Sequence, residues 1–169
     1  AANEASGIET GDVFVVTQKI VSKAEGRVLS LDTVTPSLAA ERLAAETEKD
    51  PRLVELILRE SRGVVRQRGP ILITETKHGF ICANAGIDAS NVGPEGIVCL
   101  LPEDPDASAR NIRDAIRAAT GADVAVIISD TFGRPWREGH TNVAIGVAGM
   151  LPFADYVGQT DSFGYELRV

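Results

Sequence analysis

Two clusters of oxygen-bearing side chains stand out, because each follows a run that is typical of a strand. The first cluster holds Asp88, Ser90 and Asn91, in a segment rich in turn formers. The second holds Asp130 and Thr131, directly after an apolar run. Carboxylate and hydroxyl oxygens are hard ligands that suit Mg²⁺ or Mn²⁺, the ions that bridge phosphate groups. Ligands of open α/β sheets bind at the carboxyl ends of strands, so we expect both clusters at such a crevice.

Basic side chains near these clusters could meet phosphate or carboxylate oxygens. Arg134 and Arg137 follow the second cluster, and their guanidinium groups suit both kinds of anion. Lys23 follows the first apolar run, where an ammonium group could reach a nucleotide phosphate. Structural alternatives stay open. The basic side chains can be ordinary solvent-exposed residues of a loop, Asp88 can cap a turn, and Asp130 can cap a helix.

Composition disfavours a nucleic-acid-binding protein, a membrane protein and a zinc protein. The chain has 169 residues and carries 17 Lys and Arg against 24 Asp and Glu, a formal charge of −7, which disfavours nucleic acid as a partner. No stretch approaches the ~18–20 consecutive apolar residues of a membrane helix, and residues 1–10 carry no signal pattern, so we expect a cytoplasmic protein that needs no membrane. Cys82 and Cys99 match no zinc spacing and are predicted to be buried thiols, with a single disulfide as the alternative.

Hydrophobic patterning predicts the elements that must position these residues. Acidic Asp50 before Pro51 marks a helix start, and β-branched or apolar runs bounded by turn formers mark strands. The predicted strands are 11–21, 71–76, 80–86, 123–130 and 143–149, and the predicted helices are 37–48, 51–62 and 106–119. We expect strand 123–130 to be covered on both faces. The fold class is α/β or α+β, with a mixed β-sheet and flanking helices in one domain, 1–169.

The common nucleotide-binding fingerprints are absent. The chain has no G-x-x-x-x-G-K-[ST] and no G-x-G-x-x-G, so a nucleotide would bind in a less common frame. Only two histidines are present, which excludes a His-rich metal site. His78 lies in a turn and is predicted to face solvent, whereas His140 is a candidate substrate contact beside the second cluster.

Three long blocks carry a family resemblance. Residues 11–28 (GDVFVVTQKIVSKAEGRV), 78–92 (HGFICANAGIDASNV) and 129–149 (SDTFGRPWREGHTNVAIGVAG) resemble the signature blocks of the coenzyme F420-0:L-glutamate ligase family. The resemblance implies a GTP-dependent ligase that joins the amine of L-glutamate to the carboxylate of coenzyme F420-0, and then adds further γ-linked glutamates. It implies a route through an acyl phosphate, which makes a poor electrophile reactive.

The resemblance also assigns metal and catalytic roles. By matching blocks, Asp88 and Asp130 hold a divalent ion and act in catalysis, and Thr131 supports a second divalent ion. Arg134 matches the third block and is assigned to phosphate or substrate by its charge. The implied ions are Mg²⁺ or Mn²⁺, with K⁺ as an additional candidate.

Three further residues match nucleotide contacts of the family. Lys23 and Asn91 match the family pattern, and Gln18 stands where relatives often carry Ser or Thr. His140 replaces a more usual Gln, and both side chains donate and accept hydrogen bonds.

Family members also carry a segment before and a segment after the part matched here. We therefore expect the chain by itself to bind GTP weakly and to turn over little. Family members are homodimers, and the apolar run 143–153 is a candidate dimer interface. The alternative function is a non-catalytic nucleotide- or metal-binding or dimerisation module of the same fold.

Overall fold

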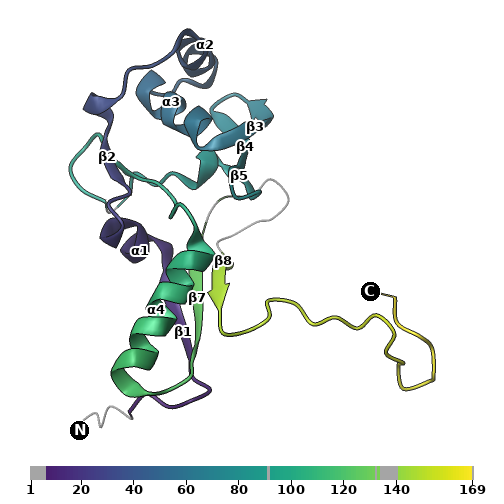
Figure 1. The fold of residues 1–169 in the computed structure, drawn as a ribbon. Helices are drawn as coiled ribbons and strands as arrows, with labels where there is room; N and C mark the ends of the chain where they lie inside the picture. The colour runs from purple at the N-terminus through teal and green to yellow at the C-terminus, as the bar shows by residue number, and fades with distance from the viewer. Residues whose placement is uncertain (1–6, 91, 132, 134–140, 169) are drawn as a thin grey trace, which may run out of the picture.

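A mixed three-stranded sheet supports one end of the molecule. The computed structural model describes residues 7–90, 92–131, 133 and 141–168. Strand β7 (Ala125–Asp130) lies in the centre of the sheet, with β1 (Val13–Thr17) parallel to it and β8 (Val143–Ala148) antiparallel to it. Helix α4 (Pro105–Thr120) runs along this sheet, as Figure 1 shows. Two chain segments far apart in sequence, β1 and β7, thus end side by side.

Only one face of this sheet has a helix against it among the described residues. Val126 and Ile128 of β7 are fully buried in the cluster that includes Ala109 of α4. On β1, Val13 and Val15 are 53% and 62% exposed. On β7 itself, Ala125 and Ile127 of the other face are partly buried, so the described residues meet only in part the prediction that strand 123–130 is covered on both faces.

A second group of elements lies beyond the carboxyl end of β1 and β7 (Figure 1). Its antiparallel sheet has the order β3-β4-β5, and a two-stranded ladder joins β2 to β6. The elements are β2 (Val28–Ser30), η1 (Leu31–Thr33), α2 (Leu38–Thr47), α3 (Pro51–Arg59), β3 (Ser61–Arg68), β4 (Ile71–Thr76), β5 (Ile81–Ala83), η2 (Asn84–Gly86) and β6 (Ile97–Cys99). Helices α2 and α3 pack on each other and on this sheet through small apolar clusters.

Local capping explains where helices α2 and α3 begin. Ser37 caps α2 by accepting a hydrogen bond from the Ala40 backbone, and Asp50 caps α3, whose first residue is Pro51. Glu55 of α3 then accepts a hydrogen bond from the Ser37 backbone at 2.9 Å. This contact ties the start of one helix to the side of the other.

The predicted fold class is confirmed, and so are the helices near 37–48 and 106–119. The strand predicted at 11–21 ends at Thr17, where α1 (Gln18–Ala24) begins. Its buried positions Gln18, Val21 and Ser22 are spaced three and four apart, which is a helical face that the β-branched composition concealed.

Two other boundaries differ from the predictions. The strand predicted at 80–86 ends at Ala83, because the next three residues all take positive φ angles of 53°, 54° and 69°. The helix predicted to run to Gly63 ends at Arg59, and β3 follows it. β3 is almost wholly exposed and owes its conformation to pairing with β4, a non-local contact that patterning does not reveal.

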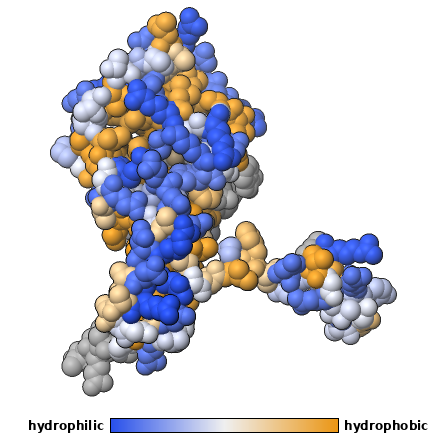
Figure 2. All heavy atoms as spheres, viewed as in Figure 1, coloured by the Kyte–Doolittle hydropathy of each residue, from blue (hydrophilic) through white to orange (hydrophobic). Residues whose placement is uncertain are grey.

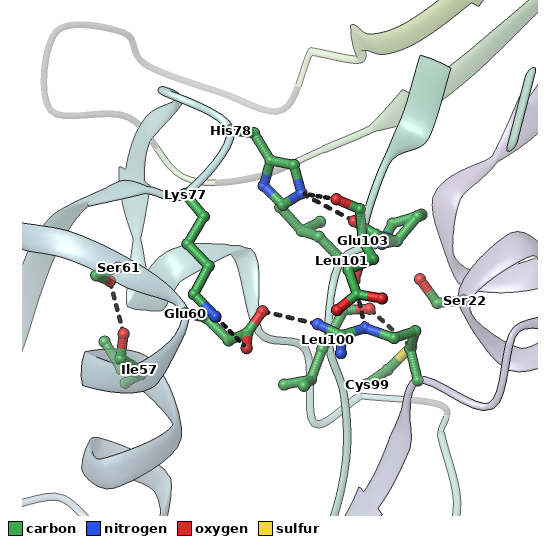
Figure 3. Close-up of polar contacts among 12 residues, drawn as sticks. Ser22, Ile57, Glu60, Ser61, Lys77, His78, Cys99, Leu100, Leu101 and Glu103 are labelled. Atoms are coloured by element: carbon green, nitrogen blue, oxygen red, sulfur yellow. Dashed lines mark hydrogen bonds and ion pairs between the residues drawn. The ribbon is translucent and has the colours of Figure 1, made fainter. Parts of the chain in front are cut away.

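Polar contacts around Glu60 link the second group of elements to the segment after β6 (Figure 3). Arg27 donates to Glu60 at 2.7 Å and to the Leu101 carbonyl at 2.9 Å, and Lys77 lies 3.4 Å from Glu60. His78 Nε2 hydrogen-bonds to the Pro102 carbonyl at 2.9 Å. The prediction that His78 faces solvent is wrong, because its ring is half-buried by this contact.

The final described segment runs away from the rest of the molecule (Figure 1). Its apolar side chains lie open to solvent, with Leu151 and Phe153 85% and 86% exposed, and Figure 2 shows apolar surface along it. Cys82 and Cys99 are buried thiols that form no disulfide, as predicted. Among the described residues, no helix has the length and apolar character needed to cross a membrane.

Candidate functional site

Two cavities open where β7 ends, and they share four lining residues. The shared residues are Asp88, Ser90, Asp130 and Thr131. One cavity, of about 230 Å³, extends toward η2 and includes Asn84. The other, of about 430 Å³, extends toward the start of α1. The structure therefore brings together the two acidic clusters that the sequence places far apart.

Backbone pairing holds Asp88 in place. Asp88 forms an isolated bridge with Cys99, with hydrogen bonds of 3.0 and 2.8 Å between their backbones. Its Oδ1 accepts from the Ser90 backbone and hydroxyl, both at 2.7 Å. Asp88 thus caps a turn, as the structural alternative held, while its Oδ2 faces Lys19. The turn cap thus uses Oδ1 of the Asp88 carboxylate, and the ion pair with Lys19 uses Oδ2.

Lys19 is a site residue that the sequence analysis missed. Its ammonium lies 2.7 Å from Asp88 Oδ2 and donates to the Ser90 carbonyl at 2.7 Å. Lys19 lines the larger cavity together with Asp130. Lys19 is the second residue after β1 ends, but predicting 11–21 as one strand hides the start of α1 and with it this position.

The two carboxylates differ in their electrostatic environment. Burial raises the pKa of Asp130, and the negative charge of Asp88 adds to the increase, against a backbone hydrogen bond from Thr131 and the charge of Lys19. Burial also acts to raise the pKa of Asp88, but hydrogen bonds from Lys19 and Ser90 outweigh it and leave the pKa below its usual value. Burial thus dominates the pKa of Asp130, whereas hydrogen bonds dominate the pKa of Asp88, and the two pKa values shift in opposite directions.

Thr131 and Gln18 both line the larger cavity. The Thr131 hydroxyl hydrogen-bonds to Asn142 Oδ1. Gln18 is 2% exposed, and its amide nitrogen donates to Ser22 at 2.7 Å and to the Leu100 carbonyl at 3.0 Å. These bonds hold the start of α1 rigidly beside the cavity.

The remaining predicted residues are placed as follows. Lys23 is exposed in the last turn of α1, and neither cavity includes it among its lining residues. Its assignment to a nucleotide phosphate remains a prediction. Asn91, Arg134, Arg137 and His140 lie outside the described residues.

Asn84 is a second residue that the sequence analysis did not single out. It lines the smaller cavity and has a left-handed φ of 53°. Its Oδ1 is enclosed and finds no hydrogen-bond donor in the part of the chain that the structure describes. Ala85, next in the chain, also has a positive φ, and its N–H donates to buried Thr74 at 3.1 Å. Such strained backbone clusters at functional sites.

The donor set suits a hard cation that also binds phosphate. In the described ranges, no three or more His, Cys, Asp and Glu side chains gather as a self-sufficient metal cage. Asp88, Asp130 and Thr131 instead supply two carboxylates and one hydroxyl beside an open cavity. Mg²⁺ typically uses one or two carboxylates and takes its other ligands from water and substrate phosphates. The residues present therefore fit a divalent ion that takes its remaining ligands from water or a phosphorylated ligand.

Comparison with known proteins identifies the family. The family described as F420-0:Gamma-glutamyl ligase matches residues 1–169. The chain is 51% identical over 166 residues to the coenzyme F420:L-glutamate ligase of Methanopyrus kandleri, covering 98% of this chain and 66% of that protein. It is 51% identical over 158 residues to the enzyme of the same name from Methanothermobacter thermautotrophicus, covering 94% and 62%. The chain belongs to the F420-0:gamma-glutamyl ligase family, as the resemblance predicted.

The match extends to more distant relatives with the same name. The coenzyme F420:L-glutamate ligase of Haloarcula marismortui is 45% identical over 171 residues, covering 98% of this chain and 66% of that protein. The chain spans just under two thirds of the length of these curated relatives.

Proposed function

We propose that this chain forms the amide bond between L-glutamate and coenzyme F420-0, with GTP as the phosphoryl donor. Its curated relatives are named coenzyme F420:L-glutamate ligases. The observation that carries the proposal is the meeting of Asp88, Asp130 and Thr131 at one pair of cavities. This donor set suits Mg²⁺ or Mn²⁺, and a K⁺ ion would be a further oxygen-bound cation.

The chemistry requires a carboxylate of the acceptor to become electrophilic. In the proposed route, the GTP γ-phosphoryl group passes to that carboxylate, and the glutamate amine attacks the acyl phosphate and releases phosphate. Repetition would add further γ-linked glutamates. Divalent ions, when bound, neutralise the crowded phosphate oxygens. Asp88 and Asp130 would hold these ions with Thr131, and Lys19 places a positive charge at the same cavity.

Nucleotide recognition would fall to the first and second sequence blocks. Gln18 lines the larger cavity from a fixed position. Lys23 and Asn91 keep the roles that the family resemblance implies, and Arg134 keeps its assignment to phosphate or substrate. The setting proposed for this chemistry is the cytoplasm, where buried Cys82 and Cys99 would stay reduced.

A turnover assay on matched variants tests the enzyme against a non-catalytic module. The wild type, Asp130→Asn and Asp114→Asn are compared for Mn²⁺-dependent GTP hydrolysis and for glutamate incorporation into coenzyme F420-0. Asp114 is exposed on α4 and lines neither cavity, so Asp114→Asn is a control that removes the same charge away from the site. We expect the wild type to show low but measurable turnover, which Asp114→Asn keeps and Asp130→Asn loses. Equal turnover in all three proteins contradicts the proposed role of Asp130, and a wild type that binds GTP with no measurable turnover at any protein concentration supports the module.

A homodimer is the proposed assembly, formed through the run 143–153. Leu151 and Phe153 are more than four fifths exposed, at 85% and 86%, and they follow the edge strand β8. Light scattering of the double variant Leu151→Asp, Phe153→Asp should give the mass of a monomer, whereas Leu38→Asp, at another exposed apolar position, should leave a dimer. A monomeric wild type contradicts the proposal.

A further inference from the structure

One carboxylate oxygen of the candidate metal site already has a cationic partner within the chain. The Lys19 ammonium lies 2.7 Å from Asp88 Oδ2, and its second contact is the Ser90 carbonyl, also at 2.7 Å. Both partners are oxygens, which is the same coordination chemistry that a hard metal ion seeks. Lys19 thus contacts two oxygens of the acidic loop at once.

This arrangement disfavours use of the same oxygen by a divalent ion, because the ion would have to share that oxygen with the ammonium at close range. A metal ligated by Asp88 Oδ2 would lie at about 2.0–2.6 Å from that oxygen, in the space next to it that the ammonium faces. The ammonium and the metal also repel each other as like charges. The Lys19 side chain is 26% exposed, so solvent and the cavity offer it other positions.

We propose that Lys19 is the resident counter-ion of Asp88, which competes with the divalent ion and is released into the larger cavity when that ion binds. The proposal rests on the divalent site of the proposed function. In the metal-free chain Lys19 neutralises Asp88, and in the metal-loaded chain it is free to meet an anionic group in the cavity that it lines. Removing Lys19 therefore strengthens metal binding in the absence of nucleotide.

A purely structural role for Lys19 predicts the opposite sign. Were Lys19 needed only to hold the 88–90 loop, its loss would loosen Asp88 and weaken metal binding. Competition predicts a gain of about two- to five-fold in Mn²⁺ affinity, the size expected from a partly exposed ion pair. The direction of the change therefore separates the two roles.

The test measures Mn²⁺ binding directly, by the electron paramagnetic resonance signal of free Mn²⁺ at low ionic strength and without nucleotide. The proteins are the wild type, Lys19→Met and Lys49→Met. Lys49 lies between α2 and α3, lines neither cavity and controls for the loss of one positive charge. We expect tighter binding only for Lys19→Met. The gain should shrink when Lys19→Met is placed in an Asp88→Asn background, because the shared oxygen is altered.

The outcomes separate this inference from the proposed function. Mn²⁺ binding with unchanged or weaker affinity in Lys19→Met overturns the competition and leaves the metal site standing. An equal gain in Lys49→Met overturns it as well, since overall charge then explains the effect. Absence of Mn²⁺ binding in the wild type without nucleotide overturns the competition, and absence of binding with GTP added as well overturns the divalent site of the proposed function.

Discussion

Asp88 and Asp130 line the same two cavities, yet their pKa values are shifted in opposite directions. Burial is the largest influence on both groups, but Asp88 also receives hydrogen bonds from Lys19 and Ser90. For Asp130, burial and the charge of Asp88 raise the pKa, and they outweigh the backbone hydrogen bond from Thr131 and the charge of Lys19. Asp130 is therefore the carboxylate whose protonation changes first as the pH falls.

Stability without metal should improve when Asp130 is neutralised. A raised pKa in the folded state means that the contribution of Asp130 to stability is present at low pH and is lost as the pH rises through that pKa. Asp130→Asn removes this loss, so we expect a higher free energy of unfolding than in the wild type at neutral pH. Urea denaturation in the presence of a chelator measures it. Asp114→Asn should show no such gain, and a less stable Asp130→Asn at pH 7 contradicts the prediction.

Mn²⁺ affinity should also depend on the ionisation of Asp130, but it should rise with pH where the stability contribution falls. A carboxylate must be ionised to bind a divalent ion, so Mn²⁺ affinity should rise with pH until Asp130 is fully ionised. Asp88 is ionised at lower pH and should not limit binding in that range. Mn²⁺ titrations across the acidic range test this. A flat profile above the ordinary carboxyl range near pH 3.8 would show that Asp130 does not limit binding.

Glu55 should make the folded chain sensitive to acid. Hydrogen bonds from Ser37, and then from Arg59, lower the pKa of Glu55 from 4.5 to about 2. Its contribution is thus complete above pH 4.5 and is lost as the pH falls through about 2. We expect Glu55→Gln to cost about 1–3 kcal/mol of unfolding free energy at pH 7, with the difference closing in acid. Exposed Glu46→Gln, on the neighbouring α2, should show no pH-dependent difference.

Local signals in the sequence were sufficient for much of the framework. The Asp50 cap with Pro51, and the apolar run that ends at Asp130, placed a helix start and a strand end correctly. Asp88 was placed beside Asp130 because both follow strands, and the cavities confirm that they meet. Site residues at the ends of strands can thus be predicted from the sequence when the strands have a distinct apolar pattern.

The missed features depend on long-range contacts. Lys19 gains its role from an ion pair with Asp88, a long-range contact that its position after β1 does not specify. The left-handed turn at Asn84 and Ala85 is held by Thr74 of a neighbouring strand, although neither residue favours such a φ as glycine does. Tertiary contacts therefore determine the positions of Lys19 and of the Asn84–Ala85 turn, which the hydrophobic pattern does not reveal.

Gly146 of β8 should not tolerate a larger residue. A Cβ at this position of β8 would lie 2.4 Å from the carbonyl carbon and oxygen of Pro105, which starts α4. Helix and strand cannot separate without opening the core, so Gly146→Ala should cost at least about 1–3 kcal/mol of unfolding free energy. Gly63→Ala, in exposed β3, meets no atom within 4 Å and should be neutral or slightly stabilising. Equal urea midpoints for the two variants would show that α4 packs less closely on β8 than the structure indicates.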